Sequence, residues 1–318
     1  MAALTIAPMT EHDLDEAAVL LARRHADHCS HQPLLDPAYA NPDTARAAMA
    51  WDDDTSGAVA RLGGELVGYL FGAPKPVGAW GPNVWVESAG IAVRDAETAR
   101  DLYAAAAEEW VAEGHTAHYA LVPAHDAELV DAWFRLGFGL QHQHAVRTPM
   151  PAPTPPPGVT IRAPVRADVP ALVEIEMVLP AHQGASPVFS PGPPYTREDA
   201  AAEWEESFDD PRFTSFVAER DGVVLGSATG SSITVSSQHV GPARPDRAGF
   251  LGFAAVLPAG RGAGLGRALG AAVLGWADDE GYRSVVTDWR ATNLLSSRTW
   301  PRLGFVPTFS RLHRVVGY

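Results

Sequence analysis

The sequence predicts an α/β protein of two similar domains, each a mixed, mostly antiparallel sheet flanked by helices. Its 318 residues are enough for two cores of ordinary size. A proline-rich segment divides the chain almost in half, and the two halves repeat the same pattern of strands and helices. Strands that alternate with amphipathic helices are typical of layered α/β folds.

The boundary between the domains is expected at residues 150–158. This segment reads Met-Pro-Ala-Pro-Thr-Pro-Pro-Pro-Gly, and five of its residues are proline. Proline resists both helix and sheet and favours an extended, polyproline-like spacer. We therefore expect one domain over 1–149 and a second over 159–318.

The two halves are related by an internal repeat. Leu4-Thr5-Ile6 corresponds to Val159-Thr160-Ile161, and residues 59–61 correspond to 217–219. Trp-x-Arg-Leu-Gly-Phe occurs at 133–138 and again at 300–305, so the offset grows from 155 to 167 residues along the chain. Matching segments in the same order with a steadily growing offset indicate a duplicated domain.

Each half contains the same elements in the same order. A short β-branched strand leads to an amphipathic helix, and a variable loop leads to a second helix. Two strands joined by a tight turn containing glycine follow, and a further strand then feeds a long helix. The expected strands are 4–6, a pair around 57–71, 84–93 and 117–122 in the first half. In the second half they are 159–161, a pair around 213–227, 250–257 and 284–289. The expected helices are 14–23, 44–51 and 96–112, and 169–177, 197–208 and 264–278. A short helix and a last strand close each half.

Composition limits the possible functions. An apolar content of 46% and a charged content of 19% indicate an ordinary globular protein, and a net charge of −14 disfavours binding to nucleic acid. The acidic balance is compatible with a cationic, amine-bearing substrate. Cys29 is the only cysteine, no signal peptide is visible, and no apolar run reaches the length of a membrane helix. We expect a cytoplasmic protein without membrane or nucleic-acid partners.

The most informative stretch runs from Gly249 to Leu269. It begins as an apolar strand and ends as a helix, and between the two lie Gly260, Gly262, Gly264 and Gly266. Glycines let a backbone approach a ligand closely, and a helix N-terminus adds a partial positive charge. The sequence therefore predicts an anion cradle, most often used for phosphates.

Two common phosphate loops do not fit this stretch. The dinucleotide pattern G-x-G-x-x-G fails because Leu265, Arg267 and Leu269 stand where its last glycine would be required. The Walker A loop needs a lysine after its last glycine, and Lys75 is the only lysine of the chain.

The pattern that fits is Arg261-x-x-Gly264-x-Gly266, preceded by Val256-x-Pro258 and followed by Asn293 and the Leu-Gly-Phe of 303–305. It resembles the pyrophosphate loop and closing segment of the GCN5-related N-acetyltransferases. The resemblance covers nearly the whole chain, once per half, and the arrangement is similar to two-domain, mycothiol synthase-like members. It implies acetyl-CoA as co-substrate, held by Ala254, Ala255, Val256, Arg261, Gly262, Ala263, Gly264, Leu265, Gly266, Arg267, Asn293, Ser296 and Trp300.

The first half departs from this family pattern. After Val93 it continues without glycine, and Asp95 and Glu97 would place negative charge where a pyrophosphate must lie. Asp126 stands at the position of Asn293. We interpret 1–149 as a degenerate copy without a coenzyme site, and 159–318 as the catalytic domain.

The catalytic groups are less clear. The resemblance implies that a backbone N–H near Val256 polarises the thioester carbonyl, as a preorganised donor. The family usually has a tyrosine proton donor where this chain has Trp300, whose indole is either packing or a weak donor. Ser297, Ser296 or water is then the candidate acid, and Asp288 the candidate base. His182, His313 and the terminal carboxylate of Tyr318 are alternatives.

Two further segments invite a functional interpretation. His25-x-x-His28-Cys29-x-His31 has spacing compatible with a metal, but no separate pair of ligands completes a tetrahedral set, so we expect a solvated helix end and no metal. The proline-rich loop 180–195 is either a wall of the substrate pocket or an ordinary surface loop.

Together these features predict an acyltransferase that moves an acetyl group from acetyl-CoA to an amine of a small molecule. A protein or peptide acceptor is the first alternative. A coenzyme-binding sensor without turnover is the second, because the family's tyrosine is missing. We expect a monomer or a homodimer.

Overall fold

The computed structural model describes residues 3–190 and 192–317. Contacts divide the chain into two compact units. The first holds the residues up to His144 together with His239–Pro245 and Pro307–Tyr318, and the second holds Ala145–Gln238 and Asp246–Val306. This division differs from the expected boundary at 150–158, because the C-terminal strand and a short loop join the first unit.

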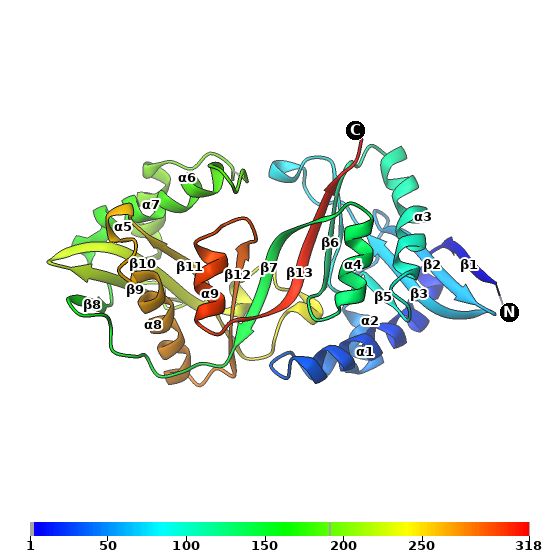
Figure 1. Ribbon diagram of the computed structural model, residues 1–318, viewed down its shortest axis with the longest axis horizontal. Coiled ribbons are helices and arrows are strands. Elements are labelled where there is room, and N and C mark those ends of the chain that lie inside the picture. Colours follow the sequence, from blue (N-terminus) through cyan, green and yellow to red (C-terminus); the bar gives the residue numbers. More distant parts are fainter. Residues whose placement is uncertain (1–2, 191, 318) are drawn as a thin grey trace. The chain divides into compact units, whose positions relative to one another are not determined.

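The first unit contains two groups of strands (Figure 1). One is a sheet in the order β1-β2-β3-β5. In the other, β4 pairs parallel to β6, and β6 pairs antiparallel to β13. Its elements are β1 (Leu4–Pro8), α1 (Leu14–His31), α2 (Pro42–Ala47), β2 (Ser56–Leu62), β3 (Glu65–Gly72), β4 (Asn83–Val86), β5 (Ile91–Val93), α3 (Thr98–Ala112), β6 (Ala117–Pro123), α4 (Ala127–Arg135), and most of β7 (Gly139–Arg147) and of β13 (Val306–Val315).

Alternate residues of the first sheet face two different cores. Ala58 and Ala60 pack with the side chains of α3, whereas Val59 between them packs with those of α1. This alternation is the pleat of a strand that is buried on both faces. The expected single strand 84–93 is instead two strands, β4 and β5, interrupted at 87–90.

The second unit is built on five strands in the order β12-β11-β10-β9-β8. All neighbours are antiparallel except β11 and β12, which run parallel. Its elements are β8 (Val159–Arg162), α5 (Val169–Glu176), α6 (Val178–Gly184), α7 (Arg197–Ser207), β9 (Phe213–Arg220), β10 (Val223–Ser232), β11 (Ala248–Val256), α8 (Leu265–Asp279), β12 (Ser284–Arg290) and α9 (Ser296–Arg302).

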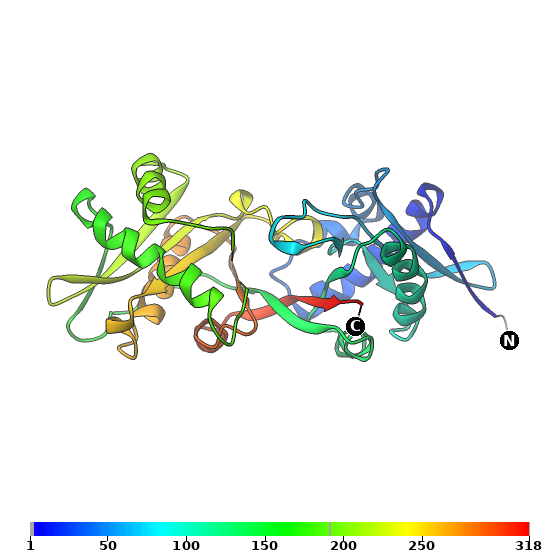
Figure 2. The ribbon, with the colours of Figure 1, turned by 90° about the horizontal axis from the view of Figure 1, so that it is seen from above.

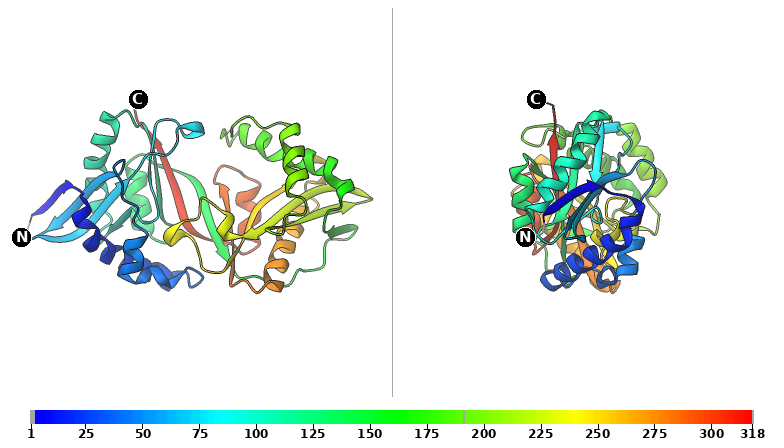
Figure 3. Two further views of the ribbon diagram at one scale, coloured as in Figure 1. Left: turned by 180° about the vertical axis from the view of Figure 1, so that it is seen from behind. Right: turned by 90° about the vertical axis from the view of Figure 1, so that its right-hand side faces the viewer.

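Helices cover both faces of this sheet (Figure 3). Leu269 and Val273 of α8 share a core with Ala218, and Leu172 of α5 shares the opposite core with Val217. The order of elements repeats that of the first unit, as the internal repeat predicts. The fold is the predicted mixed, mostly antiparallel sheet flanked by helices.

The C-terminal strand completes the first unit rather than the second. In Figure 2, β13 (red) runs beside β7 (green). Thr308 donates a hydrogen bond from its hydroxyl to the carbonyl of His144 at 3.2 Å, and Gln143 donates to Ser310 at 3.2 Å. Phe309 and Leu312 of this strand are fully buried.

The proline-rich segment is packed rather than free. Ala152 lies directly against Gly275 of α8, and Met150 packs on the core of the second unit. A β-carbon added at Gly275 would lie 2.7 Å from the β-carbon of Ala152. The segment lacks regular structure, as its prolines predict. It nevertheless packs along α8, which has Gly275 at the point where the segment crosses the helix.

The helix α1 continues to His31, eight residues beyond the expected end at Arg23. The apolar periodicity stops there, but His25 and His28 continue the buried face at helical spacing. Within the described residues, no helix combines the length and apolar character needed to cross a membrane.

Candidate active site

The strand β11 is paired on both edges along its first half and on one edge along its second half. It pairs with β10 from Gly249 to Val256, with a bulge at Gly252, because Thr229 pairs with Phe253 and Gly230 with Leu251. Its parallel pairing with β12 runs only from Ala248 to Leu251, where Thr287 donates a side-chain hydrogen bond to the Leu251 carbonyl at 3.0 Å. The end of β11 therefore has one edge turned away from β12, and such an edge can accept an extended ligand as an added strand.

The glycine-rich loop lies directly after this open strand. A single 3-10 turn spans Pro258–Gly260, and Gly262 and Gly264 have φ angles of 81° and 78°. Those are left-handed conformations that glycine adopts without steric cost. Gly264 is the N-cap of α8, and no side chain caps the helix there. The N–H groups of the first helical turn are thus left without a side-chain cap, which is the arrangement that binds anions in other proteins.

A cavity of about 370 Å³ lies over the loop and the open strand. Its lining includes every residue expected to hold the coenzyme except Ala263, and it adds Val178, Leu179, His182, Gly260, Leu295, Thr299 and Arg302. We call this space the glycine-loop cavity. Its lining includes three positively charged side chains, those of Arg261, Arg267 and Arg302. The lining residues come from four separate segments of the chain.

The space above the loop is open because Gly264 and Gly266 have no side chains to occupy it. A β-carbon at Gly266 would meet nothing nearer than Val256, at 3.9 Å, and one at Gly264 nothing nearer than Pro156, at 3.5 Å. The glycines are therefore not required by the packing of the protein itself. Backbone donors, a helix N-terminus and arginines together fit a diphosphate.

Asn293 is held by three hydrogen bonds at the edge of the glycine-loop cavity. Its side-chain oxygen accepts from the backbone N–H of Leu295 at 3.1 Å and of Ser296 at 3.2 Å, and it lies 3.1 Å from Nε2 of His182. Because an amide oxygen only accepts, His182 donates from Nε2 in this contact. When the ring is neutral, its Nδ1 is then a proton acceptor beside the cavity.

The predicted catalytic residues are not all in this lining. Val256 ends β11 and faces the cavity, but the lining includes Ser296 and not Ser297, and it does not include Asp288. Ser297 lies in the first turn of α9, where its N–H donates to the Asn293 carbonyl at 2.9 Å. His313 belongs to the first unit and stacks on Tyr119. Tyr318 lies outside the described residues.

Trp300 combines packing with a place in the cavity wall. It is 6% exposed and shares the core with Phe305, with ring centroids 6.3 Å apart. Its ring also closes on Gly270 of α8, where a β-carbon would lie 2.9 Å from the indole. Its counterpart in the first unit, Trp133, is fully buried in the same way. These contacts favour the packing interpretation.

The second unit has a further, acidic cavity. It has a volume of about 650 Å³ and is lined by Phe253, whereas the next residue of β11, Ala254, lines the glycine-loop cavity. Its walls carry aromatic side chains, five carboxylates and one arginine. They are Trp204, Phe208, Phe213, Phe253, Glu176, Glu203, Glu206, Asp209, Asp210 and Arg212.

Glu176, the last residue of α5, has unusual electrostatics in the acidic cavity. Burial, and next the charge of Glu203, raise its pKa from 4.5 to about 7, against the opposing hydrogen bond from Trp204. Glu203 itself accepts a hydrogen bond from the Tyr195 hydroxyl at 2.7 Å. A carboxylate that titrates near neutral pH is suited to exchange a proton with a substrate.

No local sequence signal marks Glu176 as a functional residue. The residue lies in an amphipathic helix and has no motif around it, and Glu203 comes from a different helix 27 positions later. The only sequence signal was the high density of acidic residues in 198–210. Their convergence with Glu176 depends on how α5 and α7 pack on the sheet.

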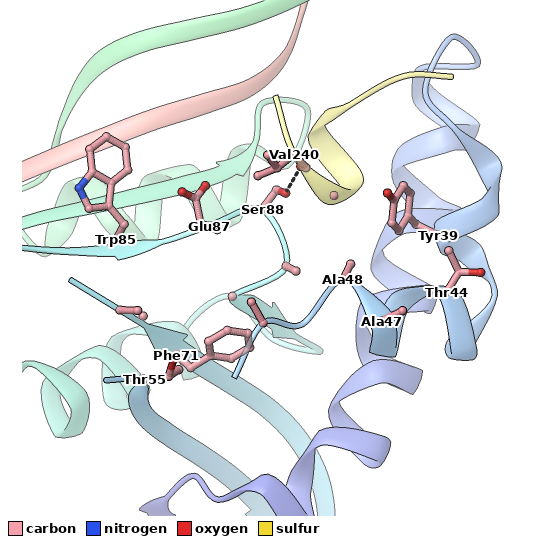
Figure 4. A pocket seen from close by; sticks show the side chains of 16 residues that line it. Tyr39, Thr44, Ala47, Ala48, Thr55, Phe71, Trp85, Glu87, Ser88 and Val240 are labelled. Atoms are coloured by element: carbon pink, nitrogen blue, oxygen red, sulfur yellow. Dashed lines mark hydrogen bonds between the residues drawn. The ribbon is translucent and has the colours of Figure 1, made fainter. Parts of the chain in front are cut away.

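The first unit has a cavity of a different kind (Figure 4). It has a volume of about 440 Å³ and is lined mainly by small and apolar residues, with Phe71, Trp85 and Val240 among them. The charged residue of its described lining, Glu87, is ion-paired with Lys75. This lining has no counterpart of the glycine-rich loop.

The start of α3 explains this difference. Its N-cap is Glu97, whose N–H is bonded to the side chain of Asp95 at 3.0 Å, and Glu97 also forms ion pairs with Arg100 and Arg135. Where the second unit turns backbone donors toward an open space, the first fills the equivalent turn with its own carboxylates. At these two equivalent turns, the second unit therefore has an uncapped helix start after glycines, and the first has a helix start occupied by Asp95 and Glu97.

A strand that leaves its neighbour, a glycine turn and a helix N-terminus are features typical of protein modules that bind a diphosphate-bearing acyl carrier or nucleotide. Comparison with known proteins narrows this class. The family model described as "Acetyltransferase (GNAT) family" matches residues 177–305. That range contains the whole glycine-rich loop, Asn293 and the Leu-Gly-Phe segment.

Individual proteins agree with the family model. The chain is 34% identical over 166 residues to a mycothiol acetyltransferase of Cellulomonas flavigena, covering 50% of this chain and 44% of that protein. It is 33% identical over 117 residues to an aminoglycoside N(6')-acetyltransferase type 1 of Salmonella typhimurium, covering 37% of this chain and 76% of that protein. The chain spans about half the length of the curated mycothiol acetyltransferases it matches.

A solved structure extends the likeness to both units. A tandem GNAT protein from the clavulanic acid biosynthesis pathway shares the fold with a TM-score of 0.50 and 18% identity, over 99% of each chain. The chain therefore belongs to the acetyltransferase (GNAT) family of acyltransferases, in a tandem arrangement.

Proposed function

We propose that this protein is an N-acetyltransferase that transfers an acetyl group from acetyl-CoA to an amine of a small molecule. The observation that carries the proposal is the glycine-loop cavity, where an open strand edge, left-handed glycines and an uncapped helix N-terminus meet. The donor set fits the diphosphate of a coenzyme, and the open edge of β11 fits an extended pantetheine arm.

In this proposal the backbone of 261–267 holds the diphosphate, with Arg261 and Arg267 beside it, and residues 254–256 hold the pantetheine. Asn293, Ser296 and Trp300 form the far wall, as the family resemblance implies. Acetyl-CoA, when bound, supplies the activated acetyl group as a thioester. The N–H at Val256 is placed to donate a hydrogen bond to a developing oxyanion, an interaction that contributes about 3 kcal/mol in other enzymes.

The acidic cavity supports an amine as the acceptor. Carboxylates from α5 and α7 surround a space with aromatic walls, a combination that attracts a cation and packs against its apolar part. Both cavities take a wall residue from β11, Phe253 in the acidic cavity and Ala254 in the glycine-loop cavity. Mycothiol and aminoglycoside acetyltransferases among the relatives also point to polar small molecules as acceptors.

Proton transfer has several candidates within this proposal. Glu176 is placed in the acidic cavity to take a proton from the ammonium group of the acceptor, since its pKa lies near 7. His182 is a second base, with Nδ1 as its acceptor atom. Ser296, Ser297 and water stay candidates for the acid, and Asp288 stays a predicted base. We further propose a cytoplasmic monomer or homodimer.

The test is coenzyme release in the presence of amines. The full chain is incubated with acetyl-CoA and a panel of polyamines, amino sugars, amino thiols and peptides, and free thiol and acetylated product are followed by absorbance and mass spectrometry. Acetylated small amines support the proposal. Peptide products alone would make the protein a peptide acetyltransferase. Coenzyme binding without any turnover would make it a sensor, which the tryptophan at position 300 favours.

A further inference from the structure

The end of helix α1 meets a distant loop of the same unit in a cluster of metal-type ligands. Asp27 and His31 are one helical turn apart and project from the same side of α1. His125 comes from the loop after β6, immediately before Asp126 caps α4. The three side chains each offer one ligand atom, and these atoms all lie within 4.8 Å of one another.

We propose that Asp27, His31 and His125 form a binding site for a divalent transition-metal ion such as Zn²⁺ in the first unit. The site is separate from the glycine-loop cavity and independent of the proposed acetyl transfer. Two imidazoles and one carboxylate are a ligand set that Zn²⁺ and its neighbours accept, with the remaining position left for water.

The geometry of the cluster agrees with this ligand set. Oδ2 of Asp27 lies 3.1 Å from Nε2 of His125 and 3.8 Å from Nδ1 of His31. Donor atoms bound about 2 Å from a tetrahedral zinc ion are about 3.3 Å apart, so both distances are close to those of a filled site. The larger distances in the cluster belong to His31, whose side chain is exposed.

The packing around His125 holds its ring in position. His28 stacks on it with centroids 4.4 Å apart, and His31 stacks on it at 4.6 Å. The His125 side chain is only 18% exposed, whereas those of Asp27 and His31 are 64% and 57% exposed. One ligand is therefore preorganised, and the other two are reachable from solvent, as an entry path for an ion requires.

Binding would replace weak local contacts. Nδ1 of His31 now lies 3.0 Å from the carbonyl of Asp27 and 3.2 Å from the hydroxyl of Ser30, both within its own exposed helix turn. The ion would exchange these contacts for a bond that ties the end of α1 to the β6–α4 loop.

The experiment uses the full chain without an affinity tag, freed of metal with a chelator and dialysed. Zn²⁺ is titrated by calorimetry, and Co²⁺ is added in parallel because its visible absorption reports the ligands. The expected result is one saturable ion per chain. Asp27→Asn and His125→Ala should weaken binding by more than about tenfold.

The matched control is His12→Ala, which removes an exposed histidine of the same unit outside the cluster. It should bind Zn²⁺ as the parent does. Asp27→Asn removes an exposed group and keeps its shape, so its unfolding temperature in chelator should equal that of the parent. Zn²⁺ should raise the unfolding temperature of the parent but not of Asp27→Asn. The absence of saturable binding, or equal binding by Asp27→Asn and the parent, would overturn the proposal.

Discussion

At the residue scale, the glycines of the loop matter because they leave open space beside the backbone. Gly264 and Gly266 border open space, and the backbone around them turns its donors into that space. The ordinary role of glycine, close packing of the protein on itself, applies instead to Gly260 and Gly270, where a β-carbon would lie within 3 Å of neighbouring side chains. Both classes of glycine thus occur within one short stretch.

We therefore predict that Gly266→Asp lowers acetyl-CoA affinity by more than tenfold, about 1.4 kcal/mol or more. The substitution brings a negative charge against a diphosphate without a clash in the free protein. Calorimetry measures the affinity, and the unfolding temperature without ligand should change little.

Gly264→Asp should lower the affinity as well, but it also adds backbone strain because φ is 78°. Gly281→Asp is its control, since that glycine has φ of 69°, an open environment and a place at the far end of the same helix. Gly281→Asp should share the strain and keep the affinity. Unchanged affinity in both Gly264→Asp and Gly266→Asp would refute the loop assignment.

Glu176 gives a prediction with a defined pH window. Its pKa is about 7 in the folded protein and near 4.5 when unfolded, so the folded state binds more protons between these values. Stability therefore falls as pH rises from about 4.5 to 7, by about 1.4 kcal/mol per pKa unit at most. Glu176→Gln should lose this dependence and be more stable than the parent at pH 8, but not at pH 4.

Urea unfolding of both proteins at several pH values measures this difference. If Glu176 is also the base, the kcat/KM of the parent should rise through pH 7, and that of Glu176→Gln should be low throughout. A parallel pH dependence of stability in the two proteins would contradict the assigned pKa.

Trp300 is the third residue for which the structure gives a specific prediction. If its role is packing, Trp300→Phe keeps most of the activity, and Trp300→Ala lowers the free energy of unfolding by about 3 kcal/mol or more. Denaturant unfolding and acetylation assays on the two variants separate the roles. A stable but inactive Trp300→Phe protein would show that the indole N–H takes part in the reaction.

At the element scale, the linker and α8 form one packed piece. Glycine in a helix interior is usually less stable than alanine by 0.5 to about 1 kcal/mol, so Gly→Ala substitutions there tend to stabilise. At Gly275, however, a β-carbon would lie 2.7 Å from the side chain of Ala152 and 3.0 Å from its backbone nitrogen. With alanine at position 275, either α8 or the segment around Ala152 would have to move.

We predict that Gly275→Ala destabilises the protein, against the intrinsic helix preference, by roughly 1–3 kcal/mol. Thermal unfolding measures the change. Gly139→Ala is the control, because a β-carbon there meets nothing within 4 Å and the position has no positive φ. A stabilised Gly275→Ala protein would mean that residues 150–158 are a loose spacer after all.

At the scale of the whole molecule, duplication has given two units with different surfaces at equivalent turns. The second unit has an uncapped helix N-terminus after a glycine turn, and the first has Glu97 and Asp95 at the corresponding place. Each carboxylate near 4 Å from a diphosphate charge costs about 1 kcal/mol even in water. We propose that the first unit has no coenzyme site.

One acetyl-CoA per chain is the expected stoichiometry. Calorimetric titration of the full chain measures it, and Gly266→Asp alone should remove the binding. Two sites, or tight residual binding in that variant, would show that the first unit kept a working coenzyme site and that Asp95 and Glu97 do not exclude one.

Much of this molecule follows from local sequence signals. The duplicated fold, the order of its elements, the glycine turn before α8 and the place of Asn293 and Trp300 in the wall of the glycine-loop cavity could all be predicted, whereas anion binding at 260–266 stays a prediction. Strand and helix periodicities and glycine spacing act over a few residues, and a repeat doubles each signal. The family resemblance rested on residues within one such stretch.

Tertiary structure decided what depends on distant segments. The sequence predicted one strand over 84–93, but the chain breaks it at 87–90, and β13 joins the first unit because its side chains complete that core. Glu176 meets Glu203, and Asp27 meets His125, only where separate elements pack together. Charges and ligands act over a few ångströms of space, whatever their separation along the chain, and no spacing rule in the sequence encodes that proximity.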